Sequence, residues 1–151
     1  MEVLTGADAV REAVGREFGP GEWFTVDQGR IDGFADDTED HQWIHVDPEK
    51  AASSPFGSTI AHGFLTLSLL PHLANSARRF DGARMGVNYG LNSVRFPAPV
   101  AVGSRIRARV TLAEVTELPG DGLQIVSKVA VELEGSEKPA CVAEWVTRSY
   151  Y

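Results

Sequence analysis

The sequence predicts an α+β domain in which an antiparallel sheet wraps over one buried helix. Hydrophobic side chains occupy nearly all sides of a helix over residues 63–79, and a helix that is apolar all round is buried rather than lying on a surface. After Gly82 the hydrophobic residues recur at every second position, the spacing of a strand with one buried face. One buried helix followed by antiparallel strands is typical of the α+β class.

Four strands are expected after this helix, because segments rich in proline and glycine separate four alternating runs. The runs cover residues 85–91, 106–112, 123–133 and 140–150. In the second run the arginines at positions 105, 107 and 109 alternate with apolar residues, which predicts an exposed face for them.

The first part of the chain contains shorter elements. Ala7, Val10, Val14 and Phe18 recur at helical spacing, and Gly19-Pro20-Gly21 is expected to end this helix. Beyond it the sequence predicts a strand at residues 23–26, a short helix at 31–37, and a loop at 47–59 with at most one helical turn at 48–52.

Length and composition indicate one globular domain over residues 1–151, with 43% hydrophobic and 23% charged residues. The net charge of −7 argues against a general nucleic-acid binder. No signal peptide or membrane span is expected, so a cytoplasmic protein is predicted. Cys141 is the only cysteine, which excludes an intramolecular disulfide and a cysteine zinc site, and we interpret it as a small core residue.

The segment Asp40-His41-Gln42-Trp43-Ile44-His45 places a carboxylate and an imidazole five residues apart. Such a pair can hold one water and move protons to and from it. On a regular helix the two side chains would point about 140° apart, so they can share a water only if the chain turns between them. From the spacing alone, a solvated acid and a surface histidine are the more common outcome.

The segment Ile60-Ala61-His62-Gly63 comes just before the apolar helix. The N–H of Gly63 is free to polarise a carbonyl oxygen that approaches the backbone closely. We expect His62 to have a structural role, satisfying backbone groups beside the start of the helix. A glycine that only begins a helix, without any ligand, is the alternative for Gly63.

Two other groups of residues are weaker candidates. His41, His45 and Asp47 could supply three ligands to a metal ion, but no independent zinc motif is present, and we predict no metal site. Four arginines, Arg78, Arg79, Arg84 and Arg95, are candidates for binding coenzyme A phosphates, although solvated surface arginines are more common.

The two motifs also carry a family resemblance. Asp40-x-x-x-x-His45, Ala51, Phe56-Gly57 and Ile60-Ala61-His62-Gly63 resemble the MaoC-type (R)-specific enoyl-CoA hydratases, and Asp-His-Gln-Trp-Ile-His-Val-Asp resembles the nodulation-protein-N-like branch. The strong resemblance covers residues 34–70. Many family members have Asn-Pro where this chain has Gln42-Trp43, so Gln42 is a candidate for orienting Asp40 in a different way.

The resemblance implies a hotdog fold, a homodimer, and reversible hydration of an enoyl thioester of coenzyme A or acyl carrier protein. In this reaction Gly63 N–H would polarise the thioester carbonyl, His45 would take a proton from water, and Asp40 would protonate the α-carbon. The chemistry requires no metal or redox cofactor. A hotdog thioesterase and a non-catalytic acyl-CoA-binding protein are the alternatives, and the intact Asp40 and His45 weigh against both.

Overall fold

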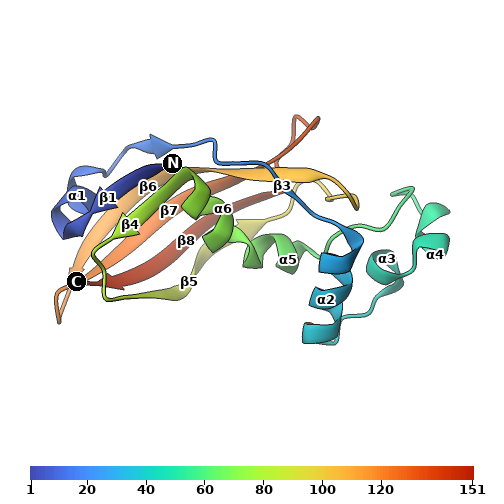
Figure 1. The fold of residues 1–151 in the computed structure, drawn as a ribbon, viewed down its shortest axis with the longest axis horizontal. Coiled ribbons are helices and arrows are strands. Elements are labelled where there is room, and N and C mark those ends of the chain that lie inside the picture. Colours follow the sequence, from blue (N-terminus) through green and yellow to red (C-terminus); the bar gives the residue numbers. More distant parts are fainter.

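The computed structural model describes all residues, 1–151. Its centre is an antiparallel sheet that curves around two consecutive helices, α5 (Gly63–Ser68) and α6 (Leu70–Ala77) (Figure 1). The long strands are β5 (Met85–Arg95), β6 (Arg105–Leu118), β7 (Gly122–Leu133) and β8 (Cys141–Tyr150). With the short strand β2 (Glu17–Phe18) the order is β2-β6-β7-β8-β5, and β3 (Phe24–Thr25) also pairs with β6. This arrangement confirms the α+β class, the hotdog fold and the four predicted strands.

The side of the sheet that faces helices α5 and α6 is apolar, because side chains alternate along each strand and the apolar ones fall on this side. In β6 the residues Ile106, Ala108, Val110 and Leu112 are fully buried. The intervening arginines point outward and form ion pairs with Glu132, Glu134 and Glu17, so the prediction of an exposed arginine face is confirmed. Cys141 is fully buried at the start of β8, as expected for a core residue.

The buried helix is divided into α5 (Gly63–Ser68) and α6 (Leu70–Ala77). The division falls at Leu69, and Pro71 lies in the first turn of α6, where its missing N–H costs no helical hydrogen bond. Leu65, Leu70 and Leu73 lie in the main core. The prediction of an all-round buried helix is wrong at Phe64, which is 67% exposed.

The first helix, α1 (Gly6–Glu12), is shorter than predicted. The chain turns at Gly15, where φ is 87°, and the Gly15 N–H donates to Leu112 O at 2.7 Å. Residues Glu17–Phe18 then form β2, which pairs with β6. Two further strands, β1 (Glu2–Thr5) and β4 (Arg78–Asp81), form a parallel pair that the sequence pattern did not predict.

The chain between β3 (Phe24–Thr25) and α5 forms three helices, which lie as a group beyond the N-terminal end of α5 (Figure 1). These are α2 (Gln28–Thr38), α3 (Trp43–Val46) and α4 (Pro48–Ala52). The strand at 23–26, the helix at 31–37 and the single turn at 48–52 are therefore confirmed. The longest helix, α2, has 11 residues, which is too few to span a membrane.

Candidate active site

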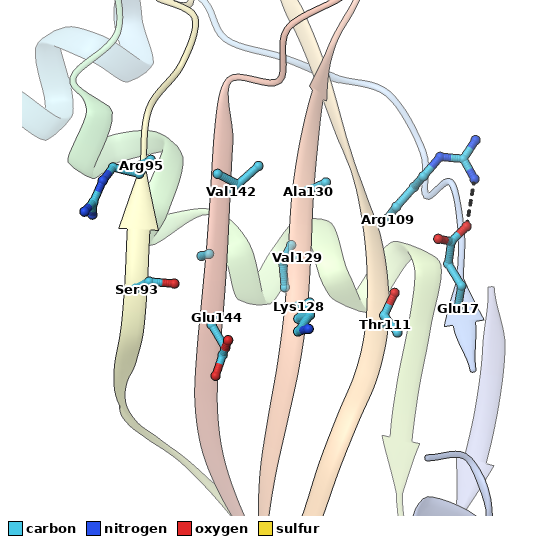
Figure 2. A pocket seen from close by; sticks show the side chains of 11 residues that line it. Glu17, Ser93, Arg95, Arg109, Thr111, Lys128, Val129, Ala130, Val142 and Glu144 are labelled. Atoms are coloured by element: carbon cyan, nitrogen blue, oxygen red, sulfur yellow. Dashed lines mark hydrogen bonds and ion pairs between the residues drawn. The ribbon is translucent and has the colours of Figure 1, made fainter. Parts of the chain in front are cut away.

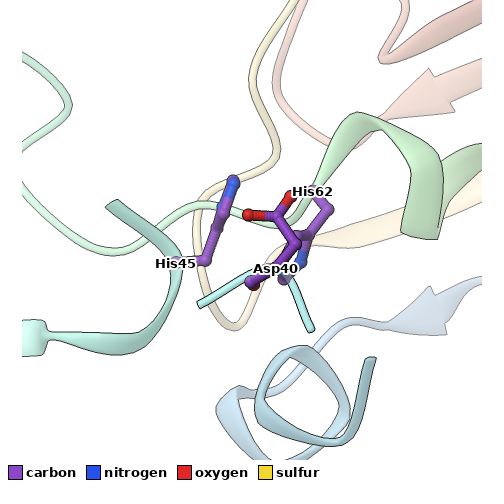
Figure 3. Close-up of side chains that lie close together, drawn as sticks. All are labelled: Asp40, His45 and His62. Carbon is purple, nitrogen blue, oxygen red and sulfur yellow. The ribbon is translucent and has the colours of Figure 1, made fainter. Parts of the chain in front are cut away.

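Asp40, His45 and His62 come together where the segment after α2, helix α3 and the start of α5 meet (Figure 3). The carboxylate oxygen and the ring nitrogens that they offer all lie within 4.8 Å of one another. The approach is possible because Glu39, with φ of 60°, ends α2 in the left-handed conformation and redirects the chain before Asp40. The chain therefore turns between Asp40 and His45, as it must if the two side chains are to share one water molecule.

The tautomer of His45 is fixed by its surroundings. The residue is 7% exposed, and its Nδ1 lies 2.7 Å from the carbonyl oxygen of Ile60. A carbonyl oxygen can only accept, so Nδ1 carries the proton and donates, which leaves Nε2 of the neutral ring as an acceptor. Nε2 is the atom that can take a proton from a bound water.

Burial lowers the pKa of His45 below the usual 6.5. The hydrogen bond to Ile60 O and the carboxylate of Asp40 oppose this shift, whereas the neighbouring His62 reinforces it. The balance favours the neutral ring, because burial disfavours a charged group and outweighs the opposing contacts. His45 is therefore a proton acceptor at neutral pH.

His62 holds the main chain of Asp40 in place. The residue is 2% exposed, and its Nε2 donates to the carbonyl oxygen of Asp40 at 2.9 Å. The ring also stacks on that of His45, with centroids 3.8 Å apart and planes inclined by 24°. This is the structural role expected for His62. Its other nitrogen, Nδ1, is buried without a hydrogen-bond partner.

The side chain of Asp40 is exposed, and it accepts only one hydrogen bond, from the main-chain N–H of Gln42 at 3.5 Å. That distance makes the bond weak. The side-chain amide of Gln42 forms no hydrogen bond in the structure, so the contact that reaches Asp40 comes from the backbone of Gln42. The position of Asp40 is set by its main chain, through His62.

A residue that the sequence pattern did not reveal, Gln28, connects three segments beneath the site. Its side-chain amide donates to His45 O at 2.8 Å and to Asp32 Oδ1 at 2.8 Å. Its carbonyl oxygen accepts from Thr59 Oγ1 at 2.5 Å. Because Gln28 lies at the start of α2 and contacts α3 across 17 residues of sequence, no local pattern indicated it.

His45 and Gly63 line one pocket of about 290 Å³, together with Thr66, Phe96 and mainly apolar residues. No acceptor in the protein binds the N–H of Gly63. A Cβ atom at position 63 would meet the Phe96 ring at 3.0 Å, so only glycine allows this ring to lie so close to the backbone. Phe96, which no motif indicated, therefore lies against Gly63 in the lining of this pocket.

The metal interpretation of His41, His45 and Asp47 is not supported by the geometry. His41 is exposed and pairs with Asp36 at 2.8 Å, a contact that raises its pKa. The cluster of Asp40, His45 and His62 has enough ligand atoms for a metal ion. However, imidazoles that bind one ion radiate from it, whereas these two rings are stacked face to face. The arrangement suits proton transfer better.

The four candidate arginines lie apart from these residues. Arg79 pairs with Asp81, Arg84 donates to Gly120 O, and Arg95 donates to its neighbour's carbonyl. Arg95 lines a hollow of about 350 Å³ on the face of the sheet that points away from α6 (Figure 2). Arg109 and Lys128 also line it, as do Glu17 and Glu144, so cations and anions are mixed there.

Comparison with known proteins agrees with this fold and these motifs. The chain is 54% identical over 148 residues to 3-hydroxyacyl-thioester dehydratase Z of Mycobacterium tuberculosis strain H37Rv, and the alignment covers 98% of each protein. It is 51% identical to nodulation protein N of Rhizobium leguminosarum bv. viciae, over 97% of this chain and 92% of that protein.

Solved structures and a family model extend the match. The X-ray structure of the monoamine oxidase regulatory protein from an Archaeoglobus species superposes with a TM-score of 0.75 at 26% identity, covering 91% of both chains. The model of the MaoC-like domain matches residues 9–133, which is most of the chain. The chain therefore belongs to the family of MaoC-like domains, close to the nodulation-protein-N branch.

Proposed function

We propose that the chain is a hydro-lyase that interconverts trans-2-enoyl and (R)-3-hydroxyacyl thioesters, with Asp40, His45 and Gly63 as its catalytic groups. The observation that carries the proposal is that the free Nε2 of His45 and the unpaired N–H of Gly63 belong to one pocket, with the Asp40 carboxylate beside His45. The close relative named 3-hydroxyacyl-thioester dehydratase supports the reaction class.

In the hydration direction the thioester carbonyl accepts a hydrogen bond from Gly63 N–H, which makes the β-carbon electrophilic. Nε2 of His45 takes one proton from water as the oxygen bonds to the β-carbon. The electrons move to the carbonyl oxygen and give an enolate. His45 passes the proton that it took from water to the Asp40 carboxylate, and Asp40 delivers it to the α-carbon as the enolate collapses, so both groups return to their starting state within one turnover.

The substrate is an acyl thioester of coenzyme A or of acyl carrier protein. The mainly apolar lining of the pocket suits an acyl chain, and Phe96 at its edge is placed to pack against the substrate near the thioester. We place the reaction in the cytoplasm, where a buried free thiol such as Cys141 stays reduced. The chemistry calls for no redox cofactor.

The pH dependence of hydration tests this function. Because burial lowers the pKa of His45, the ring stays neutral, and active as a base, down to a pH below 6.5. We expect kcat/KM for crotonyl-CoA hydration to be level near neutrality and to fall through an acid limb centred below pH 6.5. An acid limb centred above that value would contradict the role of His45 as the base.

We further propose that two copies of the chain assemble through β5. This strand ends the sheet, and its residues Met85, Val87, Tyr89 and Leu91 are between 41% and 58% exposed. A long apolar edge strand is a site of aggregation unless it is covered. A two-fold dimer that pairs β5 with β5 covers both copies at once.

Light scattering of the purified protein is therefore expected to give about twice the chain mass. Val87→Lys places a charge in the proposed interface and should shift the population toward the monomer. Thr116→Lys, at an exposed position on β6 away from β5, is the matched control and should leave the mass unchanged. A parent protein that is monomeric at micromolar concentration would rule out this assembly.

A further inference from the structure

Thr66 is a buried residue on α5 with a hydroxyl group that the mechanism above does not use. It is 2% exposed, it lines the pocket of His45 and Gly63, and its hydroxyl forms no hydrogen bond within the protein. Burying a hydroxyl without a hydrogen-bond partner lowers the stability of a fold, and such groups are rare. An unpartnered hydroxyl in this pocket therefore points to a partner on the substrate.

The other helical hydroxyl groups of the chain all have a partner. Each donates at 2.7 Å to a main-chain carbonyl oxygen three or four residues earlier, as do Thr38, Ser68 and Ser76. The corresponding acceptor for Thr66 is His62 O, which already accepts from the N–H groups of Leu65 and Thr66 at 3.0 and 3.3 Å. Among the helical serines and threonines, Thr66 alone keeps its hydroxyl free, and it alone lines the pocket of His45 and Gly63.

The pocket has an exposed end and a buried end. Phe56 and Phe96 are exposed, whereas Val100 and Thr66 are buried. Coenzyme A or a carrier protein is too large for a volume of about 290 Å³, so it stays at the exposed end and the acyl group points inward. The polar atoms of a 3-hydroxyacyl group that lie inside are then the carbonyl oxygen and the oxygen on the β-carbon.

The oxygen on the β-carbon needs a hydrogen-bond donor that the proposed catalytic groups do not supply. Nε2 of the neutral His45 ring and the Asp40 carboxylate are both acceptors, and Gly63 N–H is used by the carbonyl oxygen. A water that donates to His45 and Asp40 keeps two lone pairs. One lone pair forms the bond to the β-carbon, and the other can accept a hydrogen bond. Thr66 follows Gly63 by three residues, so both face the same side of α5.

We propose that the Thr66 hydroxyl donates a hydrogen bond to the oxygen on the β-carbon, which is the attacking water in hydration and the 3-hydroxyl in dehydration. The proposal rests on the proposed function and adds a substrate-binding residue to the same pocket. The hydrogen bond orients the water so that its remaining lone pair faces the β-carbon. In the reverse direction it favours thioesters with a 3-hydroxyl over saturated ones.

Two coenzyme A thioesters that differ only in the 3-hydroxyl test this role. Titration calorimetry compares (R)-3-hydroxybutyryl-CoA with butyryl-CoA in an Asp40→Ala background, which slows conversion of the ligand and introduces no new donor. Thr66→Val removes the hydroxyl and nearly keeps the shape of the side chain. It should weaken binding of the hydroxylated ligand about tenfold and leave the affinity for butyryl-CoA unchanged. Thr66→Ser, which retains the hydroxyl, should keep the preference for the hydroxylated ligand.

Thr111→Val is the matched control, because it makes the same change on the outward face of β6, away from the pocket (Figure 2). It should leave both affinities unchanged. The melting temperature separates substrate binding from a structural role. Thr66→Val should melt at or above the parental temperature, because an unpartnered hydroxyl is replaced by a methyl group, while kcat/KM for crotonyl-CoA falls about tenfold.

The proposal would be overturned by an unchanged affinity of Thr66→Val for (R)-3-hydroxybutyryl-CoA, or by an equal loss of affinity for both ligands. A lower melting temperature of Thr66→Val would also contradict it, since the hydroxyl would then have a partner within the protein. The binding comparison does not depend on turnover. A parent protein that hydrates no crotonyl-CoA would therefore contradict the proposed function, whereas the difference between the two ligands decides the role of Thr66.

Discussion

Asp40→Asn and His45→Asn are each expected to lower the turnover of enoyl-thioester hydration by at least about a hundredfold, the lower range for loss of a positioned acid or base. Asparagine at position 45 can still donate to Ile60 O from the place of Nδ1 but lacks Nε2. Asparagine at position 40 keeps the size of the side chain and removes only its proton-transfer ability. Initial rates with crotonyl-CoA measure both effects.

The neighbouring residues His41 and Asp36 provide matched controls. They form an exposed pair in the same region and take no part in the cluster around His45. His41→Ala and Asp36→Asn should therefore keep near-parental turnover. The melting temperatures of all four variants should be compared with that of the parent protein, because His45 is buried and its loss can also destabilise the fold. Asparagine is chosen at position 45 because alanine would leave Ile60 O without a hydrogen-bond donor. Near-parental turnover in Asp40→Asn or His45→Asn would refute the assignment.

Gly63→Pro is expected to lower turnover by about a hundredfold or more relative to Gly63→Ala, the range for losing one oxyanion donor. Both substitutions add a Cβ atom against the Phe96 ring, but only proline removes the N–H. The backbone permits proline at the first position of α5, because His62 has φ of −58° and ψ of 136°, which suits a residue before proline.

The comparison with alanine separates the two effects of the substitution. Overpacking against Phe96 should cost both variants a similar amount, about 1–3 kcal/mol in free energy of unfolding. Combining each substitution with Phe96→Ala relieves that overlap and should restore stability while leaving the proline variant inactive. If Gly63→Pro and Gly63→Ala have the same turnover, the Gly63 amide does not stabilise the transition state.

The strands of this fold were predictable because their periodicity is local. Alternation in β6 and β7 is long, and every second residue from Ile106 to Leu112 and from Leu123 to Val131 is buried. The first helix was predicted too long because Phe18 also fits the helical spacing. In the structure Phe18 is a buried residue of strand β2, which pairs with β6. The parallel pair of β1 and β4 could not be predicted, because it joins segments about 75 residues apart and neither has a pattern of its own.

At the site, the motifs indicated the proposed acid, base and amide, whereas the contacts that position these groups lay beyond local sequence. The stack of His62 on His45, the Gln28 hydrogen bonds and the Phe96 ring over Gly63 all join distant segments. The role expected for the Gln42 side chain stays a prediction, and the hydrogen bond to Asp40 comes from its backbone instead. Composition could not indicate that Arg78, among the candidate arginines, would be buried.

The most direct test of the central claim is one incubation of the purified protein with crotonyl-CoA, followed by enoyl absorbance, free thiol and chirality of the product. The proposed mechanism predicts loss of the enoyl absorbance, no release of thiol, and predominantly (R)-3-hydroxybutyryl-CoA. Release of free thiol would indicate a thioesterase, and binding without any turnover would indicate an acyl-CoA-binding protein. Either result, or a predominantly (S) product, would contradict the catalytic roles of Asp40, His45 and Gly63.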